Sequence, residues 1–181
     1  MSMERMFYPR GVAVVGSVAE GKLGYVLINQ LLKGGFRSVF AVNPKGQGLE
    51  EVPGYEKVTH IDAPVDLAVI ASPAPTVAAV LEDCGQAGVG AAVIITAGFS
   101  EVGNHAGEQE LKQVAQRYGI RFVGPNCAGI LNTHHHLFPT LEVHPPAGYT
   151  AFISQSGALG GAVLAWAEEQ GLGFSKFVSY G

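Results

Sequence analysis

Several glycine-rich or small polar turns in this chain could bind a phosphorylated ligand, and the first of them spans residues 16–24. Its glycines, Gly16, Gly21 and Gly24, allow the backbone to approach a phosphate closely. A helix that starts after such a turn favours negative charge at its first N–H groups. We therefore expect phosphate binding at this turn, with a tight turn that holds no ligand as the alternative.

The same turn excludes two common nucleotide-binding motifs. It almost satisfies the pattern G-x-x-x-x-G-K, but Leu23 follows Lys22 where a P-loop needs Ser or Thr to hold magnesium. Its glycine spacing also differs from the G-x-G-x-x-G of dinucleotide sites. A P-loop NTPase is therefore disfavoured.

The residues after the second apolar run bear on the type of nucleotide. NAD sites usually have Asp or Glu there to hold the ribose hydroxyls, whereas this run ends in Asn43-Pro44-Lys45. A lysine would attract a phosphate on the ribose, as in NADP or coenzyme A. An ordinary exposed loop lysine is the alternative.

Three further turns offer small side chains and backbone amides. Ser72-Pro73 and Thr96-Ala97-Gly98 suit an extended ligand that lies along a sheet edge, although ordinary turn chemistry explains either one alone. Cys127, in Gly124-Pro125-Asn126-Cys127, is a candidate nucleophile, but no His–acid pair can be assigned to it from the sequence. Packing explains Cys127 equally well, and explains Cys84 better.

Two further segments contain serine or histidine, the residue types of hydrolase and metal sites. Ser154-Gln155-Ser156-Gly157 is not the G-x-S-x-G elbow of a hydrolase. We expect it to form a phosphate cradle, with simple helix capping by Ser156 as the alternative. For His134-His135-His136 no metal is expected, because adjacent residues rarely converge on one ion and no other ligand stands at zinc spacing.

The elements that must position these turns are five short apolar runs at residues 12–15, 39–42, 67–71, 91–95 and 120–123. Their lack of polar alternation predicts strands buried on both faces. Helical patterns follow most of the runs, but not the second. This order predicts an α/β fold with a doubly wound parallel sheet, in which ligands bind beyond the carboxyl ends of the strands.

The helical patterns repeat apolar residues three, four and seven positions apart, and glycines mark their ends. The first is expected to end at Gly34 and Gly35, and the third at Gly119. The residues that form the three patterns are Gly24, Ile28, Leu31 and Leu32; Val77, Val80, Leu81 and Cys84; and Leu111, Val114, Ala115 and Tyr118.

The chain divides into three parts. Residues 1–130 are expected to form one doubly wound domain, and residues 131–148, which lack periodicity, a connector. Residues 149–181 show a strand at 151–153, a helix around 159–167 and a strand at 174–178. Because so small a unit cannot bury its own core, we expect the beginning of a second, incomplete domain.

Composition limits the classes of function. The 181 residues are 48% hydrophobic and 14% charged, with a net charge of −4, which gives no basic field for nucleic acid. The chain has no apolar run of the ~20 residues that span a bilayer and no secretory signal at residues 1–10. Two cysteines do not make a disulfide framework. A cytoplasmic location is expected.

Six segments occur in the order seen in one family, and the chain resembles the NDP-forming acyl-CoA synthetases, the superfamily that includes the α subunit of succinyl-CoA synthetase. The segments are 12–17, 42–44, 65–70, 96–99, 124–127 and 154–159. The resemblance implies a Rossmann-like CoA-binding domain followed by the start of a flavodoxin-like ligase domain.

The resemblance also implies a site. The loop from Ser17 to Gly24 would hold the CoA phosphates, Lys45 would meet the adenosine-phosphate end, and Cys127 would lie near the thiol. The residues expected to bind CoA are Gly16, Ser17, Val18, Glu20, Gly21, Lys22, Leu23, Gly24, Asn43, Pro44, Lys45, Ser72, Pro73, Thr96, Ala97, Gly98, Asn126 and Cys127. The residues expected to cradle a phosphorylated histidine are Ser154, Ser156 and Gly157.

The activity implied is the joining of a carboxylic acid to CoA with cleavage of ATP or GTP to NDP and phosphate, through an acyl phosphate and a phosphohistidine. That histidine lies beyond Gly181 in the family pattern, and the nucleotide-binding ATP-grasp part is missing too. We therefore expect this chain to bind CoA without completing catalysis, and assign it no catalytic residue. ATP or GTP and magnesium would act only through the missing domains or a partner subunit.

Two other functions stay open at this level. One is an NADP-binding or regulatory Rossmann module, which Lys45 permits. The other is the pseudo-ligase region of a protein acetyltransferase, which resembles the same architecture.

Overall fold

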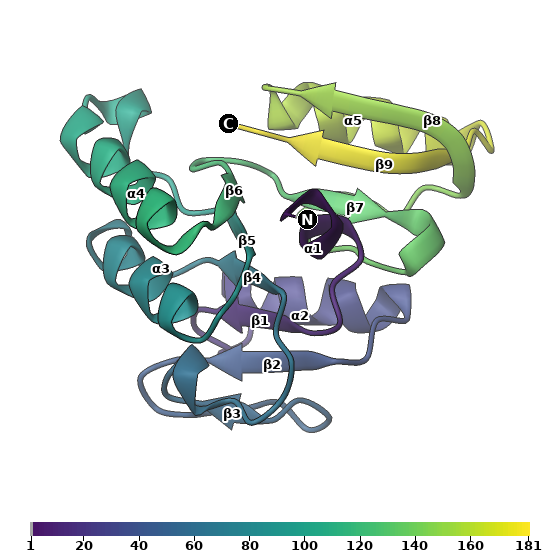
Figure 1. The fold of residues 1–181 in the computed structure, drawn as a ribbon. Coiled ribbons are helices and arrows are strands. Elements are labelled where there is room, and N and C mark those ends of the chain that lie inside the picture. Colours follow the sequence, from purple (N-terminus) through teal and green to yellow (C-terminus); the bar gives the residue numbers. More distant parts are fainter. Residues whose placement is uncertain (1) are drawn as a thin grey trace.

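A computed structural model describes residues 2–181 as two sheets with helices packed against them (Figure 1). The larger sheet has six strands in the order β3-β2-β1-β4-β5-β6, and the smaller one has three in the order β7-β9-β8. Every neighbouring pair in the larger sheet is parallel. The predicted α/β fold with a doubly wound parallel sheet is confirmed.

The strands of the larger sheet follow the predicted apolar runs closely. In the central register, Val15 lies beside Val42 on one side and Ile70 on the other, so the carboxyl ends of three strands are level. The bounds are β1 Val12–Val15, β2 Val39–Val42, β3 Gly54–Tyr55, β4 Leu67–Ile70, β5 Ala91–Ile94 and β6 Arg121–Val123.

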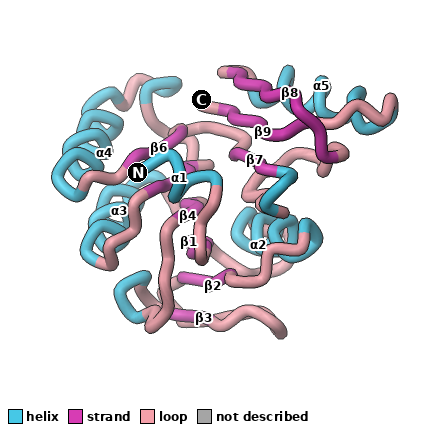
Figure 2. The backbone as a smooth tube through the Cα atoms, turned by 45° about the vertical axis from the view of Figure 1, so that its right-hand side comes forward, coloured by secondary structure: helices cyan, strands magenta, loops and turns pink. Residues whose placement is uncertain are grey.

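Alternate residues of the apolar runs pack into two separate cores, one on each face of the sheet. The runs therefore show no polar alternation. Val12 and Val14 pack in the core that includes helix α2, Leu23–Gly34. Ala13 and Val15 pack in the core that includes α3, Val77–Gln86, and α4, His105–Tyr118. Figures 1 and 2 show the sheet between α2 on one side and α3 with α4 on the other.

The predicted helix ends are confirmed. Gly35, with φ 98°, ends α2, and its N–H bonds to the carbonyl groups of Leu31 and Leu32. Gly119, with φ 68°, ends α4 in the same left-handed conformation, which glycine adopts without a Cβ penalty.

Three short elements were not expected. Helix α1, Ser2–Phe7, packs on β5, and β3 extends the sheet after β2. Strand β7, Ile130–Asn132, lies mostly inside the predicted connector and pairs antiparallel with β9, Phe174–Ser179. Each of these elements is too short to show a periodicity, so its contacts with the rest of the fold determine it.

The smaller sheet forms a second unit with helix α5, Gly157–Glu169. Strand β8, Ala147–Ser154, is longer than the predicted strand at 151–153 and lies parallel to β9. Phe177 and Leu164 form part of a small core there. Large apolar side chains also remain exposed on this unit, namely Tyr149, Ile153, Leu159, Trp166 and Leu172.

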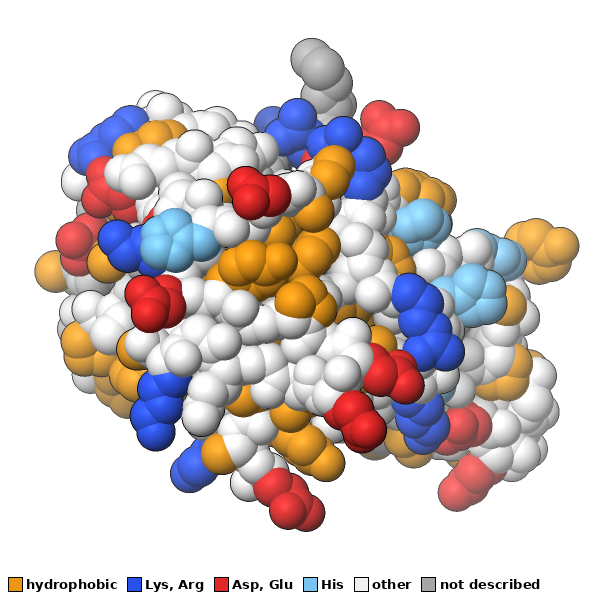
Figure 3. All heavy atoms as spheres, turned by 90° about the horizontal axis from the view of Figure 1, so that it is seen from below, with side chains coloured by type: hydrophobic (Ala, Val, Ile, Leu, Met, Phe, Trp, Pro, Cys, Tyr) orange, Lys and Arg blue, Asp and Glu red, His pale blue; other side chains and the backbone are white. Residues whose placement is uncertain are grey.

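The sequence disfavours a nucleic-acid-binding protein and a membrane-spanning protein, and the surface and the helices can be compared with that expectation. On the face seen from below, acidic and basic side chains are interspersed and form no single-sign field (Figure 3). None of the helices within residues 2–181 combines the length and apolar character that a membrane crossing requires.

The buried carboxylate of Asp66 holds the N-terminal segment at the end of the sheet where the strands begin, opposite their carboxyl ends. Asp66, only 4% exposed, accepts hydrogen bonds from the Arg10 backbone N–H at 2.9 Å, from Nε at 2.8 Å and from Nη2 at 2.9 Å. The hydrogen-bonded Arg10 guanidinium lowers the pKa of Asp66 below its usual value. Ionised Asp66 is therefore favoured in the folded state.

We predict that Asp66→Asn destabilises the fold more at neutral pH than in acid. A lowered folded-state pKa gives stability above the unfolded pKa of ~3.9 that is lost as pH falls through the folded value. The free energy of unfolding should drop by about 1–2 kcal/mol at pH 7, and this difference should shrink at pH 3. Urea denaturation at both pH values measures it, with exposed Asp62→Asn as the control. An equal deficit at both pH values would contradict the role of Asp66.

Candidate functional site

The carboxyl ends of β1, β4, β5 and β6 open onto a cavity of about 1130 Å³ between the larger sheet and the second unit. It lies where the strand order changes direction, because β1 leads to β2 on one side while β4 lies on the other. Such a switch point is the usual ligand site of open parallel sheets. The predicted residues that line the cavity are Ser17, Lys22, Leu23, Ser72, Pro73, Thr96, Ala97, Asn126, Cys127, Ser156 and Gly157.

The start of α2 forms the part of the cavity best suited to an anion. Lys22 occupies the N-cap position with extended backbone, and no side chain caps the helix. The first N–H groups of a helix have no internal partners, and the helix dipole is positive there. A Cβ on Gly24 would lie 2.6 Å from the Ser17 carbonyl oxygen, so glycine is needed for the turn to fold back on the helix.

The turns after β4 and β5 are tied to one another. Thr96 Oγ1 donates a hydrogen bond to the Ser72 carbonyl at 2.7 Å, and Thr76 Oγ1 lies 3.0 Å from Ser72 Oγ. These bonds hold the small side chains of both turns along one wall of the cavity.

Two backbone N–H groups of the turn after β5 donate hydrogen bonds within the protein. The Glu101 carboxylate accepts hydrogen bonds from the N–H groups of Gly98 and, at 3.1 Å, Phe99. The Gly98 N–H lowers the pKa of Glu101 below its usual value. Gly98, a predicted ligand contact, therefore bonds to the protein itself and does not line the cavity.

Cys127 forms part of the wall after β6. Its side chain is only 6% exposed, and Sγ–H donates to the Ile94 carbonyl at 3.3 Å. Burial raises the pKa of the thiol to about 11. Because the thiolate is the nucleophilic form, this geometry favours packing over nucleophilic catalysis. Cys84 is fully buried on α3, as expected.

The second unit contributes the turn before α5. Ser156 Oγ accepts a hydrogen bond from the Leu159 N–H at 3.1 Å, which confirms helix capping by Ser156. Ser154 is buried and donates to the Ser156 carbonyl at 2.9 Å, so it shapes the turn from beneath. Gly157 brings the start of α5 next to Ala128, where a Cβ would lie 3.1 Å from that side chain.

Other predicted residues lie outside the cavity lining. Asn43 is buried, and its side chain donates to the Gln47 carbonyl and accepts from the N–H groups of Lys45 and Gln47, so it shapes the loop after β2. Lys45 is exposed beside it. The predicted residues that do not line the cavity are Gly16, Val18, Glu20, Gly21, Gly24, Asn43, Pro44, Lys45, Gly98 and Ser154.

Several lining residues were not predicted. Leu141 and Glu142 come from a segment without periodicity, and burial raises the pKa of Glu142. Gln155 lies inside a turn that was predicted to bind a phosphate, so its position in the sequence could have identified it as a lining residue. The other unpredicted lining residues are Ala71, Ile95, Glu101, Ala128, Ala158 and Gly181.

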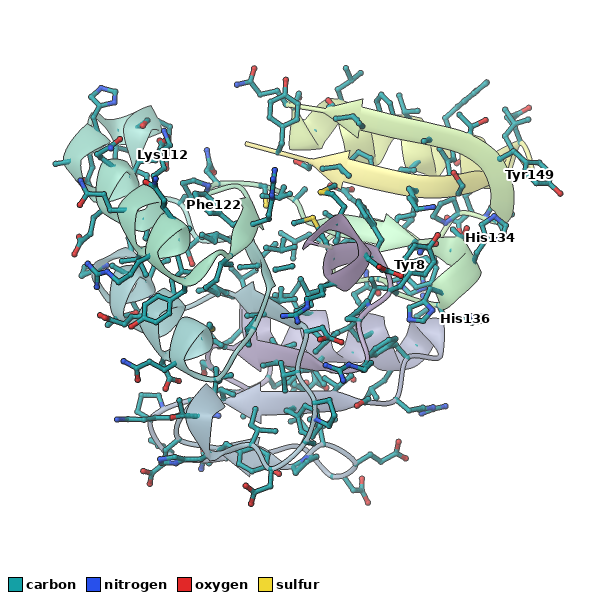
Figure 4. All side chains as sticks on the ribbon, viewed as in Figure 1. Tyr8, Lys112, Phe122, His134, His136 and Tyr149 are labelled. Atoms are coloured by element: carbon teal, nitrogen blue, oxygen red, sulfur yellow. The ribbon has the colours of Figure 1, made fainter. Side chains whose placement is uncertain are left out.

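The three consecutive histidines do not converge. Nε2 of His134 lies 2.9 Å from the Gly148 carbonyl, whereas Nε2 of His135 lies 3.3 Å from the Pro9 carbonyl. Figure 4 shows His134 and His136 on the side of the molecule away from α3 and α4. Within residues 2–181, no three His, Cys, Asp or Glu side chains come together in a metal-binding arrangement.

Comparisons with known proteins match both units. The model of the CoA binding domain family matches residues 10–133, and that of the succinyl-CoA ligase like flavodoxin domain matches residues 147–181. The acetate–CoA ligase (ADP-forming) of Methanocaldococcus jannaschii is 47% identical over 176 residues, which cover 96% of this chain and 25% of that protein.

Two further relatives agree. The α subunit of acetate–CoA ligase (ADP-forming) II of Pyrococcus furiosus is 42% identical over 99% of this chain and 40% of its own length. The apo structure of the dinucleotide-forming acetyl-coenzyme A synthetase 1 of Ca. Korarchaeum cryptofilum superposes with a TM-score of 0.95 at 42% identity, covering 99% of this chain and 40% of that one. The chain thus spans between a quarter and two fifths of these relatives.

We predict that Cys127 is nearly unreactive in the folded protein. With a pKa of about 11, the thiolate fraction at pH 8 is roughly 100-fold below that of a free cysteine, and burial slows access further. Labelling with a chromogenic disulfide reagent, in a Cys84→Ala variant that leaves one thiol, should be at least about 100-fold slower than in urea. Rapid labelling of one equivalent without urea would show an activated thiol.

Proposed function

We propose that this chain, which belongs to the CoA-binding domain family of the NDP-forming acyl-CoA synthetases, binds coenzyme A in the cavity at the strand ends. The observation that carries the proposal is the convergence of four strand-end turns and the uncapped start of α2 on one cavity. A phosphorylated ligand with an extended uncharged arm fits this combination of an anion-binding end and a small-residue wall.

The proposed orientation follows the polarity of the cavity. The diphosphate lies at the start of α2, held by Lys22 and the N–H groups after Ser17. The ribose phosphate reaches Lys45, beyond β2. The arm runs past the turns after β4 and β5, and its thiol end lies towards Asn126 and Cys127.

The turn Ser154–Gly157 serves a different anion in this proposal. Its position at the start of α5 supports a cradle for a phosphoryl group, since Ser156 and Gly157 line the same cavity as the CoA-binding turns. The capping bond of Ser156 to the Leu159 N–H leaves other N–H groups of the first helical turn available.

The chain is proposed to be the CoA-binding portion of an enzyme that joins a carboxylic acid to CoA with cleavage of ATP or GTP, through an acyl phosphate and a phosphohistidine. The names of the relatives and the fraction of their length that it spans support this. The phosphohistidine and the nucleotide site lie outside these 181 residues, in further sequence or a partner subunit. The division into a CoA-binding domain at 1–130, a connector at 131–148 and the first part of a second domain at 149–181 is part of the proposal.

The two other functions have less support. The relatives described above are acid–CoA ligases, and they favour neither an NADP-binding module nor the pseudo-ligase region of a protein acetyltransferase. The same titrations that test CoA also test NADPH.

We predict that the chain binds CoA more tightly than dephospho-CoA and that Lys45 causes the difference. Loss of one charge-assisted contact to phosphate should cost about 10-fold in affinity. Calorimetry should show CoA binding weakened about 10-fold by Lys45→Ala, with dephospho-CoA binding unchanged. Lys57→Ala, at another exposed lysine of the same region, is the control and should leave both affinities unchanged.

The outcomes separate the parts of the proposal. If the unaltered chain does not bind CoA, or binds NADPH more tightly, the proposed function is wrong. If CoA binds but Lys45→Ala weakens both ligands equally, only the placement of the ribose phosphate is wrong.

A further inference from the structure

Glu142 lines the cavity and belongs to a segment that three hydrogen bonds hold in place. Its N–H donates to Thr140 Oγ1 at 3.2 Å, and its carbonyl accepts a hydrogen bond from Gln30 Nε2 of α2 at 2.7 Å. Thr140 Oγ1 in turn donates to the Ala128 carbonyl at 2.9 Å. These bonds place Glu142 beside α2 and close to the turn that carries Cys127.

The side chain of Glu142 packs against α5 at a glycine. A Cβ on Gly161 would overlap the Glu142 carboxylate, so this glycine leaves the space that the carboxylate occupies. The side chain is therefore enclosed by α5 on one side and opens to the cavity on another.

The carboxylate of Glu142 has no hydrogen-bond or ion-pair partner within residues 2–181, although it is half-buried. The other carboxylate of the cavity, that of Glu101, bonds to Gly98 and Phe99 instead. A partly desolvated carboxylate without a partner costs free energy, and burial raises the pKa of Glu142 for this reason. A ligand group that donates a hydrogen bond would offset that cost.

The negative charge of Glu142 determines which part of CoA can lie beside it. A carboxylate repels phosphate oxygens, which are attracted to Lys22 and the start of α2. The uncharged pantetheine arm of CoA carries amide N–H and hydroxyl donors, which a carboxylate accepts strongly. Glu142 is linked through Thr140 to Ala128, the residue after Cys127, and lines the same cavity, so it lies along the path proposed for this arm.

We propose that Glu142 is a positioning residue whose carboxylate accepts a hydrogen bond from the pantetheine arm of CoA. This rests on the proposed function of the cavity. The contact fixes the arm, and with it the thiol, against α5 and the turn after β6.

The test compares CoA with adenosine 3′,5′-bisphosphate, which lacks the arm. Calorimetry on the full chain should show that Glu142→Ala weakens CoA binding about 10-fold and leaves the bisphosphate unchanged or slightly tighter. Glu142→Gln, whose amide oxygen still accepts, should bind CoA within about 3-fold of the unaltered chain. Glu169→Ala, at the exposed far end of α5, is the matched control. Thermal unfolding of each variant shows that it is folded.

CoA binding by Glu142→Ala at full affinity would overturn the proposal, as would equal weakening of both ligands. Failure of the unaltered chain to bind CoA would contradict the proposed function itself, so the two failures are distinguishable.

Discussion

All six strands of the larger sheet run in the same direction. Because every strand of the larger sheet is parallel, each connection must return over a face of the sheet, and all functional turns gather at one edge. The level register of Val15, Val42 and Ile70 sets the depth of that edge. The opposite edge holds the Asp66–Arg10 pair, which fastens the chain where no turn of the cavity lies.

The second unit encloses the space beyond the carboxyl ends of the strands. The cavity that results has one part that attracts anions and another part that carries a carboxylate. The uncapped start of α2 and Lys22 make one part attractive to anions. Glu142, brought in by hydrogen bonds from Gln30 and to Thr140, makes another part suited to neutral donors. A ligand with phosphates at one end and an uncharged arm at the other matches this division, which links the proposed CoA site to the role proposed for Glu142.

The sequence predicted the strands, the helices and most strand-end turns because each is encoded locally. The run at Val12–Val15 is apolar on both faces, and Gly119 ends its helix through its own backbone freedom. Strand β7 was not predicted because three residues show no period and β9, its partner, lies over 40 residues away. Glu142 was missed for the same reason, since tertiary hydrogen bonds alone bring its segment to the cavity. Asn43 stays a predicted ligand contact, and no spacing revealed that its side chain is bonded to its own loop.

If one CoA molecule contacts several strand-end turns at once, backbone amide shifts measured by NMR during a CoA titration will report on all of them. The amides of Ser17, Lys22, Thr96 and Asn126 should shift together with a single binding constant, while those of Arg10 and Asp66 stay unchanged. Shifts confined to one turn, or centred on the end of the sheet that holds Asp66, would rule out a CoA site shared by these turns.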